Sequence, residues 1–171
     1  MLQLSGAIVG RPVLSLRTGG MVATAVAPII NPNNLKIEGF YCQDSKDHQQ
    51  LILVEQDIRD VIPQGIVVND HDVLVEPDEL VRLKKVIDLN FELLGKQVVT
   101  VNKEKIGKVS DYATDISSMF IQKLYVSQSL LKSFSGGNLG IDRTQIVEIT
   151  SRKVVINDLH GRVPARANAM A

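Results

Sequence analysis

One short phrase occurs twice in this chain of 171 residues. VVND stands at 67–70 and VIND at 155–158, so the final aspartates, Asp70 and Asp158, are 158 − 70 = 88 positions apart. Each phrase closes a run of β-branched residues, which favour strands. A repeat of this period constrains the fold strongly, because it indicates one supersecondary unit used twice.

Further matches precede the phrase, and they come in the same order in both halves. They lie at spacings of 85, 87, 84 and 88 residues: Val13 with Val98, Gly20 with Gly107, Tyr41 with Tyr125, and Ile58 with Ile146. The spacing changes within stretches of loop composition, where insertions are tolerated. We therefore predict a tandem duplication.

Each half contains short apolar runs separated by turn residues. Val98–Val101 is a compact β-branched run, residues 121–126 alternate as a half-buried strand does, and Gly136-Gly137-Asn138 is a turn signal. Hydrophobic residues make up 44% of the chain, which is enough for a core, and aromatic residues only 4%. Several short, closely spaced strands predict a small barrel, in which closure removes exposed edges.

A different pattern lies between the halves. Pro77 suits a first helical position, and Leu80, Leu83 and Ile87 fall on one helical face. We predict a mainly β protein of two tandem small β-barrels joined by a short α-helix. The expected boundaries are 1–76 for the first barrel, 77–90 for the linker helix, 91–160 for the second barrel and 161–171 for a flexible tail.

The charge balances overall but not locally. The chain has 19 basic and 19 acidic residues. Residues 1–76 hold 5 Lys/Arg and 9 Asp/Glu, a net of 5 − 9 = −4, and residues 77–171 hold 14 and 10, a net of 14 − 10 = +4. The basic half suits RNA or an acidic protein surface, whereas the split itself suits contact between the two barrels or homo-oligomers.

Other features bear on the compartment. A single cysteine, Cys42, excludes an internal disulfide. The N-terminus lacks the basic region of a signal peptide, and the apolar stretch at 21–30 is about half the length that a membrane-spanning helix needs. We expect a cytoplasmic protein without membrane insertion.

Three groups invite a chemical interpretation, and each is better explained by structure. Asp70-His71-Asp72 has the composition of a metal site but fits a polar turn after a strand. Cys42 follows two aromatic residues in a predicted strand, as a small core residue does. Residues 133–138 lack the lysine and hydroxyl residue that end a phosphate-binding loop. We therefore predict no catalytic, cofactor-binding or metal-binding residues, and no enzyme activity.

The motifs of the second half resemble the PRC-barrel superfamily. They are Leu94–Val99, Ile106–Asp111, Lys123–Val126, Ile141–Ile146 and Val154–Asp158. A fainter copy in the first half consists of Gly10, Val13, Gly20, Val22, Ile58 and Val67–Asp70. The family includes the C-terminal domain of the ribosome maturation factor RimM and the cytoplasmic domain of the photosynthetic reaction centre H subunit. This chain lacks a segment like the other RimM domain and lacks the transmembrane helix of the H subunit.

The resemblance implies a non-enzymatic protein–protein interaction module or adaptor, with an unidentified protein partner. The alternative is a ribosome- or RNA-associated factor. The candidate contacts are exposed residues that the barrel does not need: Lys103, Lys105, Lys123, Tyr125 and Arg143. Each of them also fits a merely solvated face, with Tyr125 in the core.

Overall fold

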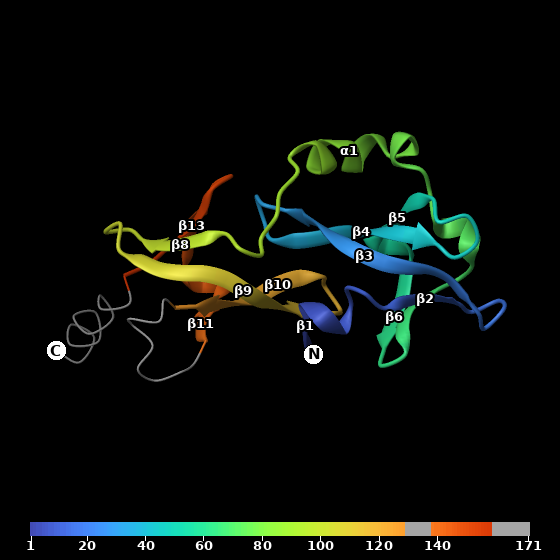
Figure 1. Cartoon of the computed structure of the whole chain (residues 1–171), viewed down its shortest axis with the longest axis horizontal. Coiled ribbons are helices and arrows are strands. Elements are labelled where there is room, and N and C mark those ends of the chain that lie inside the picture. The colour runs from blue at the N-terminus through green and yellow to red at the C-terminus, as the bar shows by residue number, and fades with distance from the viewer. Residues whose placement is uncertain (129–137, 159–171) are drawn as a thin grey trace. The chain divides into compact units, whose positions relative to one another are not determined.

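The structure is a computed structural model that describes residues 1–128 and 138–158. It is mainly β, with 52% strand, and a large mixed sheet contains all thirteen described strands (Figure 1). This confirms the predicted mainly β class. Two predicted features lie outside the described residues. They are Gly136 and Gly137 of the predicted turn, with the rest of 133–137, and the predicted tail at 161–171.

The described strands follow the duplication. In the first repeat (12–70) they are β2 (Pro12–Ser15), β3 (Met21–Asn31), β4 (Lys36–Asp44), β5 (Gln50–Val54), β6 (Ile58–Ile62) and β7 (Gly65–Val68). In the second repeat (97–158) they are β8 (Gln97–Thr100), β9 (Lys105–Asp115), β10 (Phe120–Ser127), β11 (Leu139–Asp142), β12 (Ile146–Ile149) and β13 (Lys153–Ile156). A short 3-10 helix precedes the fifth strand of both repeats, η2 (Glu55–Asp57) and η5 (Arg143–Gln145).

The pairing of strands is also duplicated. Within each repeat the first strand is antiparallel to the second and parallel to the last, so β2 lies between β3 and β7 and β8 lies between β9 and β13. Val13 faces Ile66 in the first parallel pair, and Val98 faces Val154 in the second. These partners differ by the spacings of 85 and 88 that the sequence contains, so the predicted duplication is confirmed in strand order and pairing. The predicted match of Gly20 with Gly107 is wrong, because Gly107 faces Val98 as Ala23 faces Val13, at a spacing of 107 − 23 = 84.

The ends of the sheet are open. The strand order runs β6-β7-β2-β3-β4-β5 in the first repeat and β12-β13-β8-β9-β10-β11 in the second. Among the described residues, no ladder joins β5 to β6 or β11 to β12. The two closed barrels predicted from the sequence are therefore not confirmed.

The chain forms two compact units, and their borders cut through β9 and β10. The first unit comprises 1–91 together with 113–121, and the second comprises 92–112 together with 122–171. The hairpin end at 113–121 pairs within the first unit, where Phe120 faces Lys36 of β4 and Asp115 faces Leu2 of β1 (Leu2–Leu4). The boundaries predicted from the sequence stay predictions.

The helical segment after the first repeat packs onto the first unit. It consists of η4 (Pro77–Glu79) and α1 (Val81–Asp88), preceded by η3 (His71–Val73), and η1 (Ser5–Ala7) lies near the N-terminus. Leu83 of α1 is buried against Ile29 of β3 and Ile52 of β5. Figure 1 shows α1 lying along these strands. The apolar face that the sequence predicted is thus the face that joins the core.

Candidate interaction surfaces

The repeated aspartates perform the same local task. Asp70 accepts hydrogen bonds from Ser15 Oγ at 3.0 Å and Arg17 Nε at 2.5 Å, and Asp158 accepts one from Asn102 Nδ2 at 2.8 Å. Arg17 and Asn102 correspond at the spacing of 85 residues. The Asp70 pKa is lowered by hydrogen bonds, first from the His71 backbone and then from Ser15 and Arg17. The aspartate that ends each repeat therefore binds side chains at the end of the first strand or in the turn that follows it.

The histidine beside it makes a structural contact as well. His71 Nε2 contacts a carboxylate oxygen of Asp44, whose side chain is 5% exposed. Asp44 also accepts from the backbone N–H of Lys46 at 2.7 Å, and these bonds hold the pKa of Asp44 below its usual range, with His71 the largest cause. Within 1–128 and 138–158, no group of three or more His, Cys, Asp and Glu residues is placed to hold a metal ion.

Cys42 lies in the core of the first unit. It is fully buried on β4, and its Sγ lies 3.7 Å from the carbonyl oxygen of Phe40. Burial raises the pKa of the thiol to about 12. A nucleophilic cysteine must be both accessible and ionised, and the Cys42 side chain is buried and has a raised pKa.

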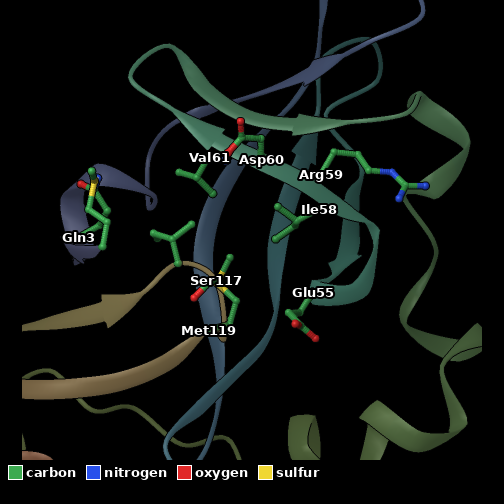
Figure 2. Close-up of a pocket in the computed structure, with 10 residues that line it drawn as sticks. Gln3, Glu55, Ile58, Arg59, Asp60, Val61, Ser117 and Met119 are labelled. Carbon is green, nitrogen blue, oxygen red and sulfur yellow. Dashed lines mark hydrogen bonds between the residues drawn. The ribbon is translucent and has the colours of Figure 1, made fainter.

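A pocket of about 460 Å³ lies beside β6 in the first unit (Figure 2). A bulge at Arg59 places Ile58 and Val61 on the same side of the strand, because Ile58 faces Val68 and Asp60 faces Val67. Figure 2 shows these two apolar side chains directed into the pocket and Arg59 directed away from it. Arg59 Nε donates to Asn69 Oδ1 at 2.9 Å, so this cation is already engaged.

A second pocket, of about 690 Å³, lies beside α1 in the same unit. Its walls combine apolar side chains, including Leu80 and Leu83, with several carboxylates. The acidic members are Glu38, Glu55, Asp57 and Glu79. Two of them have partners, since Glu55 binds Lys36 at 3.1 Å and Glu38 accepts from Asn31 at 3.3 Å.

The five residues that the sequence singled out all lie in the second unit. Lys103 is exposed in the β8–β9 turn with a φ of 66°, and Lys105 is exposed at the start of β9. Lys123 and Tyr125 are half-buried neighbours on β10, with the ammonium 5.9 Å from the ring centre. Arg143 is half-buried in η5. Their role in binding stays a prediction.

The strand register gathers further cations that the sequence analysis did not single out. Lys153 of β13 faces Gln97 of β8, and Gln97 faces Lys108 of β9. Lys105 faces Val99, two residues along β8 on the same side as Gln97. We call the exposed residues Gln97, Lys105, Lys108 and Lys153 the basic face.

The opposite side of these strands is the core of the second unit. Val98, Val154 and Ile156 are fully buried. Side chains alternate between the two sides of a strand, so burial of these residues directs Gln97 and Lys153 outward. The sequence offers this alternation as a signal, but the parallel pairing of β8 with β13 is needed to bring Lys153 and Lys108 into one row.

Ion pairs engage several cations of the first unit, namely the Met1 ammonium, Arg17, Lys36 and His71. On or near the basic face, Lys103, Lys108, Arg152 and Lys153 have no ion-pair partner within 1–128 and 138–158. The positive charge of these four side chains is therefore not neutralised by an ion pair within the described residues.

Comparison with known proteins adds no assignment, because neither a family model nor a curated protein sequence matches the chain. None of the helices in the described part of the chain is long and apolar enough to cross a membrane.

Proposed function

We propose that this protein is a non-enzymatic adaptor, built from two PRC-barrel-like domains, that binds another protein. The basic face is the observation that carries the proposal. It is a sheet surface whose exposed side chains are cationic or polar, and Lys108 and Lys153 lack ion-pair partners in the described chain. Such a surface suits docking, because complementary charge steers and orients a partner.

The short link between the edge strands supports the barrel-like part of the proposal. Six strands laid flat would separate the outer two by about 24 Å, at a spacing of ~4.8 Å. In the first repeat these outer strands are β5 and β6, and only 58 − 54 = 4 residue steps separate their ends. Four steps span at most about 14 Å, so each six-stranded sheet must curl. The second repeat has the same four-step link, from Asp142 to Ile146.

A ribosome- or RNA-associated factor is the second candidate. The same lysines favour it, since phosphate groups bind lysine and release counterions. The described basic face carries no aromatic side chain on which a base could stack. That composition favours the protein partner.

A pull-down separates the two candidates. The tagged full chain is incubated with lysate of its source organism, with and without RNase, and the bound proteins are identified by mass spectrometry. A tag-only sample is the control. We expect the same protein partner in both arms. Recovery of ribosomal proteins that disappears on RNase treatment would replace the adaptor with the RNA-associated function.

A further inference from the structure

We infer that the basic face binds a segment of the partner protein in which carboxylates alternate with apolar side chains. This inference rests on the proposed adaptor function and names the chemistry of the partner. Adjacent strands lie about 4.8 Å apart, so Lys153 and Lys108, on either side of Gln97, stand roughly 10 Å apart across the sheet.

The row is not required by the fold. The strand registers match Gln97 with Pro12, Lys108 with Thr24, and Lys153 with Gly65. The first repeat therefore forms the same strand order and parallel pairing with none of these cations. The strand order and pairing of a repeat therefore do not depend on these cations.

The surface beside the lysines also has apolar character. A pocket of about 400 Å³ is lined by Gln97, Lys105, Ile106, Gly107, Lys108, Ser127 and Gln128. Lysine side chains cover apolar surface with their methylene groups and keep the ammonium in water. A partner side chain without charge fits between the lysine stems, while its neighbouring carboxylates meet the ammonium groups.

This combination favours a protein segment over a nucleic acid. The described lining residues of that pocket include no aromatic side chain, and the Tyr125 ring on β10 already lies 5.9 Å from the Lys123 ammonium. Single-stranded nucleic acid is held by aromatic stacking as well as by charge. Carboxylates interleaved with apolar groups match both features of the surface.

Fluorescence anisotropy on the full chain tests the inference. The probe is a short labelled peptide that alternates glutamate and valine, and the comparison probes are the same peptide with lysine for glutamate and a labelled oligouridine of equal length. The test variant is Lys108→Glu/Lys153→Glu. The matched control is Lys84→Glu/Lys85→Glu, which makes the same charge change at two exposed positions of α1. Circular dichroism verifies that both variants are folded.

We expect the wild type and the control to bind the acidic peptide with affinities within about twofold, and the test variant to bind about tenfold more weakly. Absence of binding to the acidic peptide, an equal loss in both variants, or tighter binding of oligouridine than of the peptide would overturn the inference.

The adaptor proposal has a separate readout. If Lys108→Glu/Lys153→Glu recovers the same RNase-resistant partner from lysate as the wild type, the adaptor stands and the basic face is not its site. If the wild type recovers no protein partner, the adaptor itself fails.

Discussion

At the scale of single residues, Gly107 shows how closely the backbone packs in the second unit. A Cβ at this position would lie 2.0 Å from the carbonyl oxygen of Ser127, whereas a Cβ at Gly6 would meet nothing within 4 Å. We predict that Gly107→Ala lowers the free energy of unfolding by about 1–3 kcal/mol through overpacking. Gly6→Ala is the control and should change it little. Urea denaturation measures both, and equal effects would contradict the described packing.

Burial of Cys42 predicts its reactivity. The thiol is inaccessible and its pKa is raised to about 12, so the folded protein contains almost no reactive thiolate at mildly alkaline pH. We expect a thiol reagent such as Ellman's reagent to modify it only after denaturation, with a rate that follows unfolding. Rapid modification of the native protein would place Cys42 outside the core.

Asp115 makes the stability depend on pH. Its carboxylate accepts from Ser118 Oγ at 2.7 Å and Ser117 Oγ at 2.8 Å, and the N-terminal ammonium of Met1 lies 3.2 Å away. These groups lower its pKa to about 2. Because the folded-state pKa lies below the ordinary value of about 3.9, the stabilisation is complete at higher pH and is lost as pH falls through about 2.

The variant Asp115→Asn isolates this contribution. We expect it to be less stable than the wild type near neutral pH, and we expect the difference to shrink as pH falls from about 5 to about 2. Denaturation midpoints measured across this range provide the test. The exposed Asp78→Asn is the control. A difference that stays constant down to the lowest pH would show that the carboxylate charge is not the cause.

At the scale of elements, Leu83 is the buried side chain of α1, and Val86 and Ile87 pack beside it, partly buried. Leu83 is 8% exposed and packs on Ile29 and Ile52, whereas Val81 on the same helix is 80% exposed. We predict that Leu83→Ala costs about 2–5 kcal/mol of stability, from lost burial and the cavity left behind. Val81→Ala should cost far less. Similar losses in a thermal unfolding experiment would mean that α1 does not pack through this face.

Elements also show which parts of the fold the sequence predicts. The spacings of 85 and 88 residues match the partners Val13–Ile66 and Val98–Val154, because a duplicated unit keeps its pairing. The direction of that pairing was not predictable, since β-branched runs suit parallel and antiparallel ladders alike. The bulge at Arg59 was also not predictable, because nothing in the local sequence marks an extra residue in the strand.

The candidate site was only partly predictable. Lys103 and Lys105 lie in a charged turn that follows an apolar run, so sequence alone marks them as exposed near a strand end. Lys153 is 153 − 108 = 45 residues from Lys108, and only the order β13-β8-β9 brings the two into one row. Position across a sheet depends on long-range pairing, which a local pattern does not contain.

At the scale of the whole molecule, the two repeats have the same strand order but differ in net charge. The two repeats share strand order and the aspartate that ends each repeat, but residues 12–70 carry a net charge of 4 − 7 = −3 and residues 97–158 a net charge of 8 − 6 = +2. A duplicated scaffold allows this, because one copy retains packing residues while exposed positions of the other change. We accordingly propose that the second repeat binds the partner.

The decisive measurement is an RNase-treated pull-down that compares the wild type with Lys108→Glu/Lys153→Glu and Lys84→Glu/Lys85→Glu. If the basic face binds a protein partner, the wild type and the α1 variant both retain that partner and the basic-face variant loses it. Retention of the partner by all three proteins, or its absence from all three, would contradict binding at the basic face.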